Sequence, residues 1–200
     1  QVEPYDIFLF SGSGLISNII KIGTGSQWSH VAISLRDAEH DMNMLFESTT
    51  LSDVPSLDTG VPMKGVSRVD LKRRVASYPG KVAWRNISGP RPPDCYKISN
   101  EVVQKFNGRP YEKNQLELAA SALDISGLFK NQPDMSSIFC SELTAYLLNA
   151  LGILDMDRPP NEYTPSDFSG DLPLTGSYTW GDIVVIKKDI KKTFWPFSKD

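Results

Sequence analysis

Cysteine and histidine are scarce in this chain, which has two of each among its 200 residues. The two cysteines, Cys95 and Cys140, cannot build a disulfide-rich scaffold or a four-cysteine zinc site. A structural zinc site would need every cysteine and histidine of the chain, and their spacing fits no common ligand pattern. We therefore expect two free thiols, no metal and no organic cofactor.

A basic excess is also missing, because 21 Lys and Arg residues face 24 Asp and Glu residues, for a net charge of -3. This balance argues against a nucleic-acid partner. No apolar run approaches the roughly 20 residues of a membrane-spanning helix, so we expect no membrane span. The opening stretch "QVEPYDIFLF" lacks the basic, apolar and small-residue order of a signal peptide, which favours a cytoplasmic protein.

The composition is that of an ordinary globular protein, with 40% hydrophobic and 22% charged residues. Two hundred residues suit one domain, which we expect to span 1–200. The last residues, about 189–200, form a basic and aromatic tail. This tail suits a peripheral contact with a membrane surface or a partner, but its short length favours a solvated terminus or a strap packed on the domain.

Short strand-like runs and helical patterns divide the chain, with turns rich in proline, glycine and polar residues between them. Residues 29–49 predict a hairpin with a polar turn at 37–43, in which His40 is interpreted as a solvated side chain, and 50–66 predict a loop. The helical patterns cluster between 96 and 151, and Cys95 falls in the proline-rich turn before them. These patterns predict an α+β fold with mostly antiparallel strands. Strands are expected at 5–12, 27–35, 44–49, 81–87 and 180–188, and a strand and short helix at 66–80. Helical segments are expected at 14–23, 96–111, 113–129 and 136–154, with Asn107-Gly108 capping the second and Gly152 ending the last.

Cys140 is the candidate nucleophile. It lies in "IFCSELTAYLL", near the start of the clearest helical pattern, where unpaired backbone N–H groups and the helix dipole favour a negative charge. A thiolate is the reactive form of cysteine, and this position lowers the pKa of a thiol. The same residue begins a helical stripe with Leu143, Leu147 and Leu151, so a plain core role is the competing interpretation.

His30 is the candidate base, in the strand-like stretch "QWSHVAISL". Glu47, in "LFEST", lies on the strand that we expect to pair with it, where cross-strand neighbours are about 5 Å apart. A carboxylate that accepts from one imidazole nitrogen leaves the other nitrogen free to face a thiol. Each residue also has a structural interpretation: His30 as a hydrogen-bonded strand histidine, and Glu47 as a charge on an edge strand.

The order of motifs resembles a known family. The stretches "DIFLF", "GLISNIIKIGTGSQWSHVAISL", "LFEST", "FNGRPYE", "IFCSEL" and "YTPSDF" follow the order found in circularly permuted papain-like hydrolases. These proteins form the YiiX-like branch of the NlpC-type superfamily, which is related to a poxviral group and to lecithin retinol acyltransferase-like proteins. The resemblance runs from about Tyr5 to Asp182. It implies a small antiparallel sheet or barrel packed on a helical cluster that carries the nucleophile.

The resemblance also implies residue roles. The family's nucleophile, base and acidic third member fall on Cys140, His30 and Glu47, in an order reversed from that of papain by the permutation. Tyr111 of "GRPY" falls near the implied site, and Glu142 falls on a glutamate that ties the helix start to a neighbouring loop. Ser29 and Ser141, which flank the histidine and the cysteine, are expected to support the site or bind substrate. Two departures are the "VAI" that replaces Val-Gly-Ile and the long loop at 50–66.

Three functions are compatible with these residues. The first is a cysteine hydrolase that cleaves an amide or ester, with a peptide, γ-glutamyl amide or lipid acyl group as the implied substrate. The second is a lipid acyltransferase with the same covalent step, although acyltransferase relatives carry a second histidine where this chain has Glu47. The third is a non-catalytic module that binds a lipid or a partner, a role that would require none of Cys140, His30 and Glu47.

Overall fold

A computed structural model describes residues 1–37, 41–50, 53–110 and 139–188 of the chain. Some predictions concern residues outside these ranges. They are the solvated His40, the supporting Tyr111, the helix at 113–129 and the tail at 189–200.

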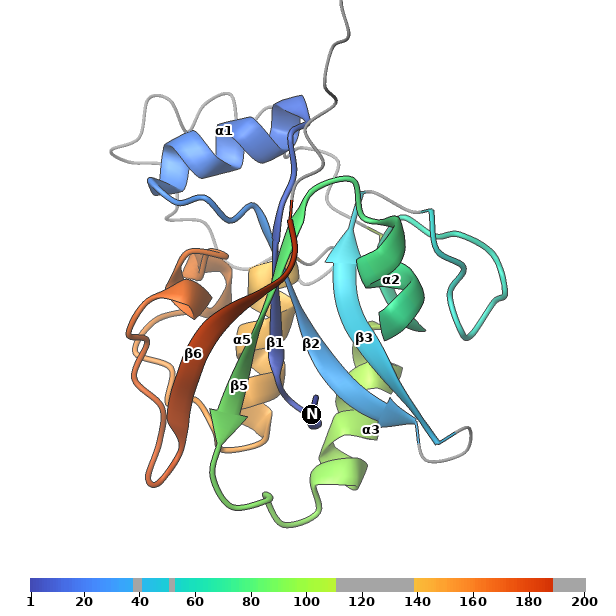
Figure 1. Ribbon diagram of the computed structural model, residues 1–200. Coiled ribbons are helices and arrows are strands. Elements are labelled where there is room, and N and C mark those ends of the chain that lie inside the picture. Colours follow the sequence, from blue (N-terminus) through green and yellow to red (C-terminus); the bar gives the residue numbers. More distant parts are fainter. Residues whose placement is uncertain (38–40, 51–52, 111–138, 189–200) are drawn as a thin grey trace, which may run out of the picture.

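The strands form one antiparallel sheet with the order β4-β3-β2-β1-β5-β6 (Figure 1). β4 and β6 lie at its two edges, so the described strands make an open sheet and not the barrel that the resemblance allowed. The α+β class with antiparallel pairing is confirmed. The strands are β1 (Ile7–Ser11), β2 (His30–Asp37), β3 (Met42–Thr49), β4 (Gly65–Asp70), β5 (Lys81–Ser88) and β6 (Thr179–Lys187).

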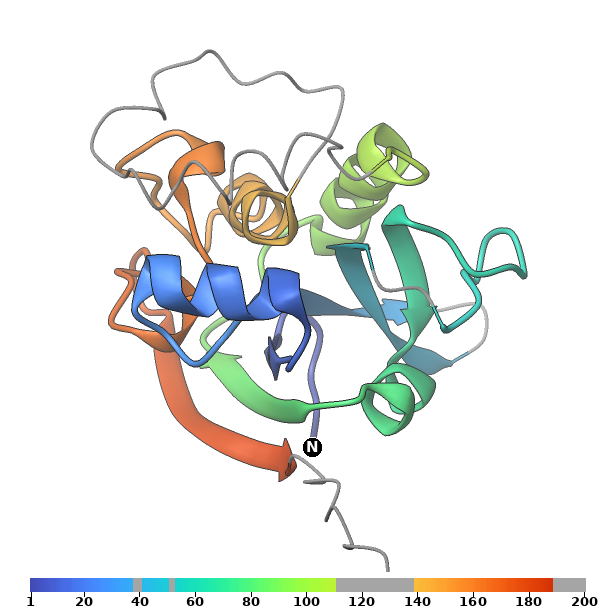
Figure 2. The same ribbon diagram turned by 90° about the horizontal axis from the view of Figure 1, so that it is seen from above.

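Helices cover both faces of the sheet (Figures 1 and 2). α5 (Cys140–Ala150) packs on β2 and β3 with α3 (Cys95–Phe106) beside it, whereas α2 (Leu71–Ser77) packs against β3 and β4. α1 (Leu15–Thr24) lies across one end of the strands. Two short 3-10 helices, η2 (Pro160–Glu162) and η3 (Asp167–Ser169), follow α5. Within the described ranges, no helix has both the length and the apolar character needed to cross a membrane.

Several predicted boundaries need correction. Cys95 was predicted in a turn, but it is the first residue of α3, because the prolines before it precede the helix and cannot interrupt its hydrogen bonds. α5 ends at Ala150, two residues before the stop predicted at Gly152. There Gly152 adopts a φ of 69°, a left-handed conformation that glycine accepts at little cost and that terminates helices. The strands of the predicted hairpin extend into its turn, to Asp37 and from Met42.

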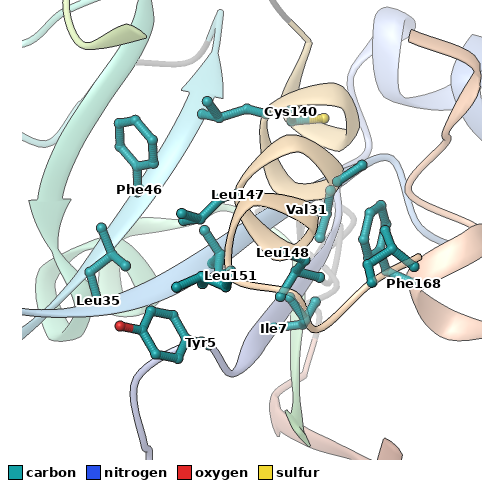
Figure 3. Packing of buried hydrophobic residues seen from close by; sticks show 14 of the residues in the cluster. Tyr5, Ile7, Val31, Leu35, Phe46, Cys140, Leu147, Leu148, Leu151 and Phe168 are labelled. Atoms are coloured by element: carbon teal, nitrogen blue, oxygen red, sulfur yellow. The ribbon is translucent and has the colours of Figure 1, made fainter. Parts of the chain in front are cut away.

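The alternation of side chains along the strands produces two cores. The larger core lies between the sheet and the α3–α5 pair, and Figure 3 shows part of it around Leu147 and Leu148 of α5 and Leu151 just after the helix. The smaller core lies under α2 and includes Phe8, Phe10, Leu45 and Tyr78. Because α5 is fixed along its length by the larger core, its first residue has a defined position beside the start of β2.

Candidate active site

Cys140 is the first residue of α5, and its side chain is 5% exposed within the larger core (Figure 3). The extended backbone of Phe139 starts the helix, and the Glu142 carboxylate accepts the Phe139 backbone N–H at 3.3 Å. Leu147 of the same helix and Leu151, which follows its last residue, are fully or almost fully buried, as a core stripe requires. Cys140 therefore has the core position of the structural interpretation and also the helix-start position of the catalytic one.

His30 is the first residue of β2, and its ring Nε2 lies 2.6 Å from Oε2 of Glu47. Ile33 pairs with Phe46, and continuing this register by one residue places Glu47 opposite Ala32. Glu47 and His30 are therefore diagonal neighbours on one face of the sheet, a spacing that long side chains bridge. The predicted contact is present, although it is diagonal and not directly opposite.

The thiol of Cys140 and the imidazole of His30 interact directly. Burial by itself would raise the pKa of Cys140, but the charge and hydrogen bond of His30 outweigh burial and lower it. Burial likewise lowers the pKa of His30, but Cys140 and then Glu47 raise it to about 9. Since Nε2 is held by Glu47, Nδ1 is the ring nitrogen left to interact with the sulfur. Both shifts favour the thiolate–imidazolium pair over the neutral pair.

Two backbone N–H groups point at the same sulfur, those of Val31 and Ser141. Both contribute to the lowered pKa of Cys140. Ser141 belongs to the first turn of α5, whose N–H groups have no partner within the helix. This end of the site thus offers hydrogen-bond donors to a negative charge.

Glu47 is bound on its other side by Arg74 of α2, whose Nε lies 2.8 Å from Oε1. Both side chains are 1% exposed. Burial raises the pKa of the Glu47 carboxyl, but the positive charge of Arg74, with a further contribution from His30, brings it below its usual value. Glu47 is therefore ionised, with one oxygen toward each partner. The sequence analysis did not identify Arg74.

Ser29, Ser141 and Glu142 make side-chain hydrogen bonds to the backbone near the site. Ser29 is buried, and its hydroxyl accepts the Gly12 N–H at 3.3 Å. The Ser141 hydroxyl donates to the Tyr163 carbonyl at 2.6 Å, which anchors the start of α5. Glu142 caps the same helix start by its bond to the Phe139 backbone, and its implied tie to a neighbouring loop stays a prediction. These contacts are structural, and a role in substrate binding stays a prediction.

The comparisons with known proteins concern the fold. No family model matches the chain, and no curated protein matches it either. A crystal structure of YiiX from Escherichia coli O157:H7, described as a metalloprotein with the designation DUF1105, is similar with a TM-score of 0.51 and 19% identity. The alignment covers 92% of this chain and 89% of YiiX. At this identity the similarity shows a shared α+β fold and nothing about activity.

The name of YiiX raises the question of whether this chain offers a metal site. In the part of the chain that the structure describes, no group of three or more His, Cys, Asp and Glu side chains is arranged to hold a metal ion. Near Cys140, the carboxylate that a metal would require is already bound by Arg74 and His30. The described residues therefore do not fit a metal at this site, and we derive no step through one.

Proposed function

We propose that this chain is a cysteine hydrolase with a circularly permuted papain-like arrangement, which cleaves an amide or ester bond through an acyl-enzyme on Cys140. The observation that carries the proposal is the connected row of Cys140, His30 and Glu47. A thiol, a base and an orienting carboxylate in contact are what nucleophilic catalysis needs. A core cysteine needs no such partners.

In the first step, the Cys140 thiolate attacks the carbonyl carbon of the substrate and forms a C–S bond, while the carbonyl π electrons move to oxygen. Backbone N–H groups at the start of α5 stabilise this oxyanion. The oxyanion then collapses, and the bond to the leaving nitrogen or oxygen breaks. The His30 imidazolium gives its proton to that leaving atom, which leaves a thioester on Cys140 and a neutral imidazole.

In the second step, the neutral His30 takes a proton from water, and the resulting hydroxide oxygen attacks the thioester carbonyl. Collapse of the second oxyanion releases the carboxylic acid product and restores the thiolate beside the imidazolium. Glu47 keeps the ring in one orientation throughout, so that the nitrogen opposite its own contact faces the reacting atoms.

The proposal is tested by the reactivity of Cys140 toward iodoacetamide as a function of pH, in a Cys95→Ser background. We expect alkylation well below pH 8, because the thiol pKa is lowered by His30. In the His30→Ala variant the reaction should move toward the pH of an ordinary buried thiol. The ultraviolet absorbance of the thiolate, compared with the Cys140→Ser protein, gives the same titration without requiring a reagent to enter the site.

An unreactive Cys140 whose absorbance titrates above pH 8, with no change in His30→Ala, would contradict the proposal and favour the core interpretation. If the expected titration is found, hydrolysis of amides, thioesters and acyl lipids is the next assay. There Cys140→Ala and His30→Ala should both abolish turnover while the far-ultraviolet circular dichroism stays unchanged.

A further inference from the structure

A second buried ion pair extends the site beyond its three expected members. Arg74 lies on α2, on the face of the sheet opposite α5, and its Nε is 2.8 Å from Oε1 of Glu47. The other oxygen of Glu47 lies 2.6 Å from His30. The carboxylate is therefore held from two sides, and it cannot turn toward one partner without leaving the other.

The surroundings of Arg74 fix the guanidinium itself. Its central carbon lies 5.6 Å from the ring centroid of Phe10 and 5.4 Å from that of Tyr78. Nη1 donates to Asp53 at 3.2 Å, and Nη2 donates to the Thr49 hydroxyl at 3.5 Å. A planar group with several N–H donors suits such a pocket, whereas the single ammonium of a lysine would make fewer of these contacts.

The helix that carries Arg74 is tied at both ends. The Asp70 carboxylate accepts the Arg73 backbone N–H at 2.7 Å and caps the start of α2. The Lys187 ammonium donates to carbonyls at the helix end, including that of Ala76 at 2.6 Å. These contacts fix the position of α2, and therefore of Arg74, relative to the sheet. This short helix thus helps to position the proposed catalytic row.

Charges alternate along the resulting row: Arg74 is positive, Glu47 negative, His30 positive and Cys140 negative. Each buried charge has an opposite neighbour, which is the condition under which buried ions persist. The other titratable groups beside Glu47 or Arg74 are Tyr78, which burial keeps neutral by raising its pKa to about 12, and Asp53. Without Arg74, the Glu47 carboxyl would lose the largest of the contributions that oppose the effect of burial on its pKa.

We propose that Arg74 is a positioning residue of this site, which acts on the Cys140–His30 pair through Glu47 by holding one oxygen of that carboxylate. The inference rests on the proposed function, because it assigns Arg74 a role in the same row. It predicts that the effect of Arg74 on the thiol depends on the presence of Glu47.

The test measures iodoacetamide alkylation of Cys140 against pH in full-length Cys95→Ser protein. Arg74→Met removes the charge, Arg74→Lys keeps it, and Arg73→Met is the matched control on the exposed face of the same helix. Loss of a residue that supports a functional group typically costs about tenfold to a hundredfold. We therefore expect Arg74→Met to slow alkylation at neutral pH by about tenfold or more and to shift its acid limb to higher pH. The alkylation rate of Arg74→Lys should fall between the rates of Arg74→Met and the parent. The rate of Arg73→Met should equal that of the parent.

A double-mutant cycle separates positioning from a merely structural role. In a Glu47→Gln background, Arg74→Lys and Arg74→Met should cause no further loss of reactivity, because the residue through which Arg74 acts is already changed. If Arg74→Met does not fold, the cycle is completed with Arg74→Lys, alone and combined with Glu47→Gln. Folded Arg74 variants with the parent pH profile would overturn the inference, as would an equal loss with and without the Glu47 carboxylate.

The same measurements distinguish failure of this inference from failure of the proposed function. If His30→Ala leaves the alkylation profile of the parent unchanged, no thiolate–imidazolium pair exists, and the proposed function fails with everything built on it. If His30→Ala removes the reactivity but the Arg74 variants behave like Arg73→Met, the proposed function stands and Arg74 has no part in it.

Discussion

At the scale of single residues, the protonation state of His30 is the most sensitive property of the site. Its pKa of about 9 depends on the negative charges of Cys140 and Glu47, which together outweigh the opposing effect of burial. The imidazolium should therefore be present at neutral pH and be lost as the pH rises through about 9. Removing either negative neighbour should lower the pKa of His30.

The small number of histidines makes this prediction measurable, since His30 and His40 are the two in the chain. The imidazole C–H resonances of both can be followed by NMR, and the spectrum of His30→Ala assigns them. We expect the His30 resonance to titrate near pH 9 in the parent and at lower pH in both Cys140→Ser and Glu47→Gln. Glu101→Gln, an exposed change on α3, is the control. An unchanged His30 titration in both variants would contradict the charge coupling described here.

The sequence analysis identified Cys140, His30 and Glu47 because each is a nucleophilic or ionisable residue. Each also lies within, or at the start of, a strand or helix with a clear hydrophobic pattern. It missed Arg74, because this residue is one of two adjacent arginines in a charged stretch. The sequence alone does not show which of the two is buried. The available signal was the helical spacing of Leu71, Arg74 and Tyr78, which places an arginine among buried residues. That spacing assigns a buried face, but the partner of the arginine depends on how α2 docks on the sheet.

At the scale of elements, α2 is a short helix whose position depends on its ends. Helices of this length are marginal without tertiary support, so the Asp70 cap contributes a large share of its local stability. The same helix places Arg74 over Glu47. A substitution of the Asp70 cap should therefore affect the contact between Arg74 and Glu47, because it changes the stability of α2.

We expect Asp70→Ala to lower the free energy of unfolding by about 1 kcal/mol, the usual value of an N-cap side chain. Urea unfolding followed by circular dichroism measures this difference. Lys72→Ala, an exposed change within α2, should leave the stability nearly unchanged and serves as the control. Equal stabilities of Asp70→Ala and Lys72→Ala would show that the cap does not stabilise α2.

Element boundaries were predicted less well than element types. The strands of the hairpin and the helix that begins at Cys140 were found because their apolar patterns are long. Cys95 was placed in a turn because the prolines before it suggested an interruption, yet prolines just before a helix leave its hydrogen bonds intact. The diagonal relation of His30 and Glu47 depends on strand register, which no single strand sequence reveals.

At the scale of the whole molecule, the site depends on the larger core, because that core sets where α5 begins. Leu147 of α5 is fully buried in this core (Figure 3). Leu147→Ala should lower the free energy of unfolding by about 2–5 kcal/mol, through lost burial and the cavity left behind. Chemical denaturation gives the value.

Leu57→Ala removes the same atoms from a side chain that is 40% exposed, and it should cost far less than Leu147→Ala. Similar losses at the two positions would mean that α5 is not fixed by the core as described. The overall α+β class was predicted from the short, mostly antiparallel strand patterns and from the clustering of helical patterns between 96 and 151. The open sheet order was not, because pairing between distant strands is decided by packing across the whole chain.

The four charged groups of the row come from positions 30, 47, 74 and 140, so they meet after β2, β3, α2 and α5 have all found their places. In an incompletely folded chain, Cys140 is an ordinary thiol with a pKa near that of free cysteine, about 8.5. A thiol with a lowered pKa is therefore expected only when all four elements are in place. The appearance of a low-pKa thiol would thus serve as a built-in chemical signal that folding is complete.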